Sequence, residues 1–126
     1  DEMWLAGLMH KAISQNPKAV PAKSVLTMAT RNGAIALKKL DSCGSIAVGK
    51  KADLTLLDMN TLCSTPAHDL YSTIVYQATS AAVDTVFVDG NRLLDRGCLT
   101  TIDENALIRE CQRHSKSIVR RAGIRY

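Results

Sequence analysis

The side chains that could bind a metal ion or transfer a proton are few in this sequence, and they stand far apart. The histidines are His10, His68 and His114, and the four cysteines lie at positions 43, 63, 98 and 111. Metal sites are recognisable when such residues recur at short spacings, as in H-x-H, H-E-x-x-H or C-x-x-C. None of these spacings occurs, so we predict no catalytic and no metal-binding residue here and assign no substrate-binding residue.

His68 and Asp69 are neighbours, and an imidazole beside a carboxylate could act in acid–base chemistry or bind a metal. A structural or surface role is the interpretation we favour. His10 lies near the end of a predicted amphipathic helix, where a cation suits the helix dipole. His114 stands among basic residues of a terminal helix, so we expect it to be solvated or packed there.

The segment from Gly44 to Lys51 nearly matches the phosphate-binding loop G-x-x-x-x-G-K-[ST]. Lys51 occupies the last position, where that loop needs a hydroxyl group for magnesium. The segment also leaves a predicted helix and enters a strand, whereas a phosphate loop opens a helix whose amides hold the anion. We therefore interpret it as a turn with two glycines, Gly44 and Gly49.

The composition is that of one globular unit. The chain has 126 residues, of which 46% are hydrophobic, 22% charged and 4% aromatic. So few aromatic residues make a base-stacking surface for single-stranded nucleic acid hard to build, and no apolar run approaches the ~20 residues of a membrane span. The cysteine spacing fits reduced thiols and predicts a cytoplasmic protein. Since the chain opens at Asp1 without a methionine, we expect a missing upstream part.

The net charge of +4 comes from the C-terminal end, where residues 109–126 hold six basic side chains and one acidic one. A basic helix can bind nucleic acid or another anionic surface. It is more often a solvated helix face, and the composition disfavours nucleic acid as a partner. Anion binding by residues 109–125 stays open as an alternative function.

The hydrophobic spacing predicts helices at both ends of the chain and short strands between them. Asp89-Gly90 is a strong signal for a β-hairpin. Residues 101–104 fit a capping box that begins the last helix. The apolar face of that helix is formed by Leu107, Cys111, Ile118 and Ala122. Residues 69–76 fit either a helix or a strand. The predicted helices are 2–14, 21–38 and a long terminal one, and the predicted strands are 52–58, 83–88 and 92–95. This order indicates an α+β structure with a small antiparallel or mixed sheet.

The second predicted helix carries a stripe of small residues, Ala22, Ala29, Gly33 and Ala36. Small side chains allow another backbone to approach closely, so this stripe predicts a partner inside or outside the chain. A self-associating α+β interaction module, held together through the stripe, is therefore a second alternative function.

Several motifs together resemble the C-terminal end of metal-dependent hydrolases of the amidohydrolase superfamily. Their order and spacing match the branch that contains chlorohydrolases and the S-adenosylhomocysteine, methylthioadenosine, guanine and cytosine deaminases. The matching segments are Thr27-Met28-Ala29-Thr30-Arg31-Asn32-Gly33-Ala34, Gly44-Ser45-Ile46-x-x-Gly49-Lys50-x-Ala52-Asp53-Leu54, His68-Asp69, and Val83-Asp84-Thr85-Val86-x-Val88-Asp89-Gly90.

The resemblance implies an α+β fragment. Residues 1–40 would be the last helices of a (β/α)8 barrel, residues 41–100 the C-terminal strands of a composite β-sandwich, and residues 101–126 a terminal helix with a basic tail. The partner would be the missing N-terminal and barrel portion, and we expect a homo-oligomer. Trp4 would either anchor its helix or lie near the mouth of the active site.

The resemblance also implies a hydrolase that acts on carbon–nitrogen or carbon–halogen bonds and deaminates or dechlorinates a nitrogen heterocycle. In the family a zinc or iron ion activates water, and the histidine, aspartate and glutamate residues that serve it lie upstream of this chain. The chain alone should hold no cofactor and be inactive.

Overall fold

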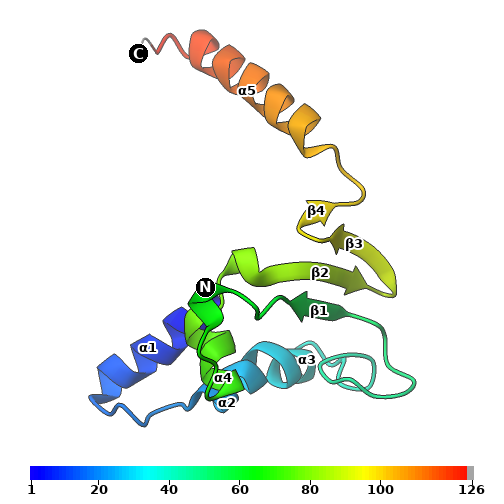
Figure 1. Cartoon of the computed structure of the whole chain (residues 1–126). Coiled ribbons are helices and arrows are strands. Elements are labelled where there is room, and N and C mark those ends of the chain that lie inside the picture. Colours follow the sequence, from blue (N-terminus) through cyan, green and yellow to red (C-terminus); the bar gives the residue numbers. More distant parts are fainter. Residues whose placement is uncertain (125–126) are drawn as a thin grey trace.

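A computed structural model describes residues 1–124, which form a group of helices, a small sheet and one helix that stands apart from both (Figure 1). The helices of this group contact one another, and part of the group, residues 70–77, lies in the chain between the first and second strands of the sheet. The elements are α1 (Glu2–Ser14), α2 (Ala22–Thr27), η1 (Met28–Asn32), α3 (Gly33–Ala36), β1 (Leu54–Leu57), η2 (Leu62–Ser64), α4 (Leu70–Ser72), η3 (Thr73–Gln77), η4 (Ser80–Ala82), β2 (Val83–Val88), β3 (Asn91–Asp95), β4 (Cys98–Leu99) and α5 (Glu104–Arg121).

Helix α1 has the bounds that the sequence predicts. Asp1 is its N-cap and Glu2 lies in its first turn, where a negative charge favours the helix dipole. Gln15 closes the helix in a left-handed conformation with φ 48°, and its amide donates to the carbonyl of Ala12. Only Gly7 is buried, so the other side chains of α1 keep much of their surface in solvent.

The second predicted helix is present, but five residues of π-helix (η1) separate α2 from α3. A π-helical turn contains more residues than an α-helical turn, so it rotates the following residues around the helix axis. The small residues therefore do not share one face: Ala22 is buried, whereas Ala29 and Ala36 are exposed. Ala34 is buried instead, and the predicted stripe is wrong in this respect.

The four strands form one antiparallel sheet in the order β1-β2-β3-β4. The β2–β3 hairpin turns at Asp89 and Gly90, whose φ angles are 51° and 81°. Two successive positive φ angles are those of a type I′ turn, which suits the right-handed twist of a two-stranded ribbon. The hairpin and the antiparallel sheet are thus confirmed, and β4 is a short strand that the sequence did not predict.

The undecided segment 69–76 is helical, since it contains α4 and the π-helix η3. It contributes Val75 to the central cluster of the helical group, where this residue packs with Ala22 and Val25. Tyr76 and Leu26 lie at the edge of the cluster and are partly buried. The core is small, and many large apolar side chains of the described residues remain exposed.

Helix α5 leaves the sheet through residues 100–103 and points away from the helical group (Figure 1). Its N-cap is Asp103, whose carboxylate accepts from the amide of Ala106 at 2.9 Å. Thr101 therefore does not cap the helix as predicted, because Asp103 is the residue in position to do so. No residue of α5 is buried, and Leu107 and Ile118 are 47% and 57% exposed.

Within residues 1–124, no helix has both the length and the apolar character that are needed to cross a membrane.

Candidate functional site

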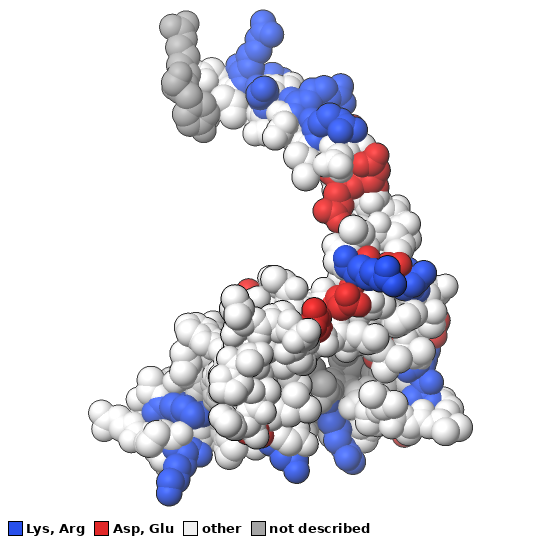
Figure 2. All heavy atoms as spheres, in the orientation of Figure 1, with Lys and Arg blue, Asp and Glu red and all other residues white. Residues whose placement is uncertain are grey.

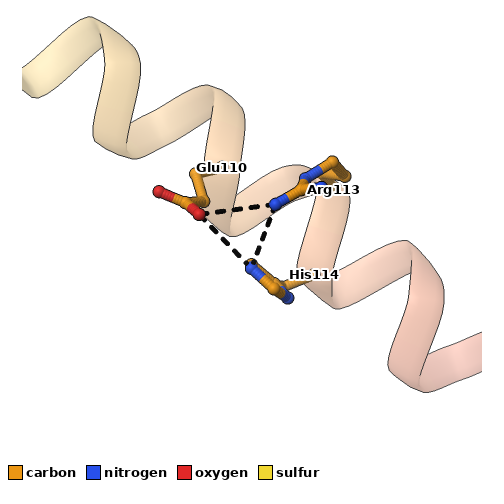
Figure 3. Close-up of polar contacts among 3 residues, drawn as sticks. All are labelled: Glu110, Arg113 and His114. Atoms are coloured by element: carbon orange, nitrogen blue, oxygen red, sulfur yellow. Dashed lines mark hydrogen bonds and ion pairs between the residues drawn. The ribbon is translucent and has the colours of Figure 1, made fainter.

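The three histidines lie in separate parts of the structure. His10 is exposed on α1 and His68 is exposed in the loop before α4. His114 lies on α5, where its Nε2 is 3.5 Å from a carboxylate oxygen of Glu110. The same oxygen is 3.4 Å from the Arg113 guanidinium, as Figure 3 shows. These side chains are mostly in solvent, so the cluster is an exposed ion-pair network with a small effect on stability.

Asp69 serves as a helix cap. Its carboxylate accepts from the amide of Ser72 at 3.0 Å and from the Ser72 hydroxyl at 2.5 Å. The hydrogen bond from the hydroxyl is the main cause that lowers the pKa of Asp69, and the amide adds to it. The structural interpretation of the His68-Asp69 pair therefore holds for Asp69, which begins α4.

Residues 1–124 do not provide a ligand set that fits zinc or iron. Within this part of the chain, no three His, Cys, Asp or Glu side chains lie close enough together to hold an ion. A catalytic zinc ion needs at least three protein ligands. The described residues alone therefore do not form such a site, and the expectation that the chain contributes no catalytic or metal-binding residue stays a prediction.

The loop from Gly44 to Lys50 packs against α3. A side chain at Gly44 would place its Cβ 2.5 Å from the Cβ of Ala34, so only glycine allows this loop to lie against α3. The ammonium group of Lys50 donates to the carbonyl oxygens of Leu40 and Cys43 and closes the loop. The segment contains turns and leads into β1, and it opens no helix, as the sequence predicts.

A partly buried polar contact joins α1 to η3 through Lys11. Its ammonium group donates to the Tyr76 hydroxyl at 2.8 Å and to the carbonyl oxygens of Ala19 and Val20, both at 3.0 Å. All three ammonium protons are therefore used. Val20 has φ 45°, which is rare for a β-branched residue, so Lys11 holds the loop after α1 in a strained conformation.

An open hollow of about 480 Å³ lies beside this contact and is lined by basic and aromatic side chains. The Lys23 ammonium group stands 5.6 Å from the centroid of the Tyr71 ring, a distance typical of cation–π contact. Two of the residues that line the hollow are engaged by other groups of the protein: Lys11 donates to three oxygens, and one carboxylate oxygen of Asp69 accepts from Ser72.

Residues just before β1 that belong to the family motifs form hydrogen bonds with the turn of the β2–β3 hairpin. The carboxylate of Asp53 accepts from the amide of Asp89 at 2.7 Å, and the Gly90 amide donates to the Ala52 carbonyl. The Lys51 ammonium group forms an ion pair with Asp89 at 3.0 Å, and this hydrogen bond is the main cause that raises the pKa of Lys51. These contacts tie the segment before β1 to the β2–β3 hairpin.

The matching family model is the amidohydrolase family, which covers residues 1–93. The chain belongs to the amidohydrolase family.

Curated relatives agree with the assignment to the amidohydrolase family. The chain is 41% identical over 122 residues to a 5'-deoxyadenosine deaminase of Methanosarcina acetivorans. It is 37% identical over 122 residues to a 5-methylthioadenosine/S-adenosylhomocysteine deaminase of Dictyoglomus thermophilum. Each match covers 97% of this chain and 28% of the relative, so the chain spans little more than a quarter of these proteins.

Solved structures show the same fold. An adenosine deaminase of Xanthomonas campestris, crystallised with zinc, matches 93% of this chain and 27% of its own chain, with a TM-score of 0.88 and 33% identity. The zinc-bound atrazine chlorohydrolase of Arthrobacter aurescens matches 89% of this chain and 25% of its own chain, with a TM-score of 0.79 and 24% identity. The latter likeness concerns the fold alone.

Sequence reasoning missed the Lys11–Tyr76 contact and the role of Asp53. Residues 11 and 76 are 65 positions apart, and no local pattern connects them. A weak signal existed in Gly7, a glycine in the interior of a predicted helix, because such a residue often marks a close approach. In the structure, the Tyr76 ring lies against Gly7.

Proposed function

We propose that this chain is the C-terminal part of a zinc-dependent amidohydrolase that deaminates an adenosine-like nucleoside. The observation that carries the proposal is the identity of 41% to a 5'-deoxyadenosine deaminase over nearly the whole chain. The reaction would consume water, release ammonia and replace the ring amino group by an oxygen. Relatives and a solved structure named as deaminases, at 33% identity or more, favour deamination over dechlorination.

The part that this chain would play is structural. Residues 1–40 would be the last helices of the barrel, residues 41–100 the C-terminal strands of a β-sandwich, and residues 101–126 a terminal helix. Exposed apolar side chains of α1, such as Leu5 and Ile13, support the presence of further barrel elements around it. We infer that the rest of the polypeptide covers this face.

One face of the sheet supports the same proposal. The cross-strand neighbours Thr55, Val86, Leu94 and Leu99 share a face, because directly paired residues point to the same side. Leu99 is 39% exposed and Thr55 is also exposed. A second layer of strands, contributed by the upstream part of the chain, would cover this column and complete a sandwich.

Zinc is the metal we propose, since both solved neighbours described above were crystallised with it. The described residues supply no ligand set for it, so the chain would position the barrel and take no part in coordination. The free cysteines Cys43, Cys63, Cys98 and Cys111 support a cytoplasmic location, where thiols stay reduced.

The experiment is an ammonia-release assay on the intact, zinc-loaded polypeptide that contains these residues. Substrates are 5'-methylthioadenosine, S-adenosylhomocysteine and 5'-deoxyadenosine, with a chlorotriazine as the contrasting substrate. We expect ammonia from at least one nucleoside and no chloride from the triazine. Chloride release without ammonia would reverse the choice of reaction, and no turnover of any substrate would contradict the proposal.

The 126-residue chain alone is the matched control, and we expect it to be inactive. If this chain were purified from its source alone and well folded, the self-associating interaction module would replace the enzyme proposal. Salt-dependent binding to DNA at low ionic strength would favour the basic-helix alternative.

A further inference from the structure

Lys11 differs from the other basic side chains of the helical group. Figure 2 shows Lys and Arg side chains projecting from the surface of the structure. The other five basic residues in the first 40 positions are exposed, namely Lys18, Lys23, Arg31, Lys38 and Lys39. Lys11 is half-buried, and its ammonium group donates to three protein oxygens. The same group stands 5.3 Å from the centroid of the Tyr76 ring, a distance at which the ring attracts a cation.

Two of the three oxygens determine the backbone conformation of Val20. The Ala19 carbonyl belongs to the peptide unit before the Val20 Cα, and the Val20 carbonyl belongs to the peptide unit after it. Each oxygen lies 3.0 Å from the Lys11 nitrogen. Peptide units are planar, so a donor that holds both of them fixes the φ and ψ angles between them.

Val20 needs such a restraint, because two features of the sequence disfavour its conformation. Its φ is 45°, in the left-handed region that a β-branched residue rarely adopts. Pro21 follows it, and a residue before proline favours an extended conformation with negative φ. Strained backbone of this kind persists where surrounding contacts impose it. Lys11 supplies two of those contacts, so the turn should relax when the ammonium group is removed.

The conformation of Val20 affects how α1 lies against its neighbours. Val20 directly precedes Pro21, the N-cap of α2, so its angles set the direction in which α2 leaves the turn. Helix α2 contacts η3, and η3 carries Tyr76, whose hydroxyl is the third acceptor of Lys11. Lys11 thus fixes α1 against α2 and η3 at one point.

Under the proposed function, the position of α1 bears on catalysis. Residues 1–40 would be the last helices of the barrel, so α1 would follow the last barrel strand. In (β/α)8 enzymes, the connections that leave the carboxyl ends of the strands build the active-site face. A small displacement there is costly, because the reaction depends on precise placement of the substrate.

We propose that Lys11 is a positioning residue for the deaminase reaction, which holds the last strand-to-helix connection of the barrel in place through α1. This inference rests on the proposed function. Lys50 offers a matched comparison within the chain. It is also half-buried and its ammonium group donates to two carbonyl oxygens, but these belong to the segment between α3 and β1.

Kinetics of the intact, zinc-loaded polypeptide test the positioning role. Lys11→Met and Lys50→Met each remove an ammonium group and keep a flexible unbranched chain. Both should lower the midpoint of thermal unfolding. With the best nucleoside substrate, kcat/KM of the folded enzyme should fall about tenfold in Lys11→Met and less than about twofold in Lys50→Met. The comparison separates positioning from a general loss of stability.

Tyr76→Phe distinguishes the contacts of Lys11 from one another. It removes one of the three acceptors and leaves both carbonyl contacts that restrain Val20. The fall in kcat/KM should therefore be smaller than in Lys11→Met. A fall of the same size would contradict the part assigned to the turn at Val20.

Amide hydrogen exchange tests the structural step without an activity assay. The Ala19 amide donates to the Asn16 carbonyl at 3.0 Å, and the Ser24 amide donates to the Pro21 carbonyl at 2.8 Å. Both amides flank Val20, so they should exchange faster in Lys11→Met and at the unaltered rate in Lys50→Met.

Three results would overturn the proposal. Equal falls of kcat/KM in Lys11→Met and Lys50→Met, or an unaltered kcat/KM in Lys11→Met, would show that Lys11 has a structural role only. Unaltered exchange at Ala19 and Ser24 would show that Lys11 does not hold the turn. If the unaltered protein turns over no nucleoside, the proposed function fails and the positioning role fails with it, whereas the exchange measurement still shows whether Lys11 restrains Val20.

Discussion

Substitution of Gly7 by alanine tests the packing of α1 on Tyr76. A Cβ atom at position 7 would lie 2.7 Å from the Tyr76 hydroxyl oxygen and 2.9 Å from Cε1 of its ring. The ring cannot move freely, since Lys11 donates to its hydroxyl at 2.8 Å and the ring packs against the central cluster. Gly7→Ala should therefore displace Tyr76 and weaken the contact with Lys11.

The magnitude follows from three opposing effects. Alanine favours a helix interior over glycine by ~1 kcal/mol. Overpacking costs about 1–3 kcal/mol, and loss of a hydrogen bond to a charged group costs about 1.5–3 kcal/mol. The expected net result is a loss of about 1.5–5 kcal/mol in the free energy of unfolding, toward the lower end if the hydrogen bond to Lys11 is only lengthened.

Gly33→Ala is the matched control, because both glycines lie within helices. The nearest atom to a Cβ at position 33 is the Met28 carbonyl oxygen at 3.7 Å, an ordinary contact. This variant should gain up to ~1 kcal/mol. The assay is unfolding of the polypeptide by urea and by heat. In thermal unfolding, a change of about 1 kcal/mol in the free energy of unfolding shifts the midpoint temperature by roughly 4 °C.

A rise in stability for Gly7→Ala would refute the reasoning. A second test repeats the substitution in a Tyr76→Leu background, where the clashing atoms are absent. There Gly7→Ala should be neutral or stabilising. An equal loss in both backgrounds would show that Tyr76 is not the cause.

Three further predictions concern the other contacts. Asp53→Ala should cost about 1 kcal/mol and speed amide exchange at Asp89, because it removes the 2.7 Å hydrogen bond to that amide; unchanged exchange would contradict this. The ionised Asp69 cap contributes stability above its usual pKa of 3.8, and this contribution is lost as the pH falls through its lower folded pKa. Asp69→Asn should therefore flatten the loss of stability in acid, and identical acid unfolding curves would argue against it. Elemental analysis of the purified 126-residue chain should find no stoichiometric divalent metal, and one tightly bound zinc per chain would disprove that prediction.

The sequence predicted elements whose signals are local. The Asp89-Gly90 pair specified the hairpin, and the apolar spacing with Asp1 and Glu2 at its start specified α1. The family motifs led to the correct family, because each contains residues with strict backbone or packing roles. Gly44, for example, lies against Ala34, where no side chain fits.

Features that depend on contacts between residues far apart in the chain could not be predicted from local sequence patterns. The π-helical segment Met28–Asn32 rotates the helix and separates the small residues that a regular helix would align. The capping role of Asp103, two residues after the predicted Thr101, was decided by the path of the chain between β4 and α5. The contact of Lys11 with Tyr76 joins segments that have no pattern in common.

The central claim is that these residues are the C-terminal scaffold of a longer amidohydrolase. The most direct test is the intact mass of the natural polypeptide, captured with an antibody against the loop of residues 59–69. Since the chain has a mass of 13.7 kDa and spans 28% of its relatives, the account predicts a mass more than three times larger, with metal-ligand histidines upstream. A mass near 13.7 kDa would contradict it.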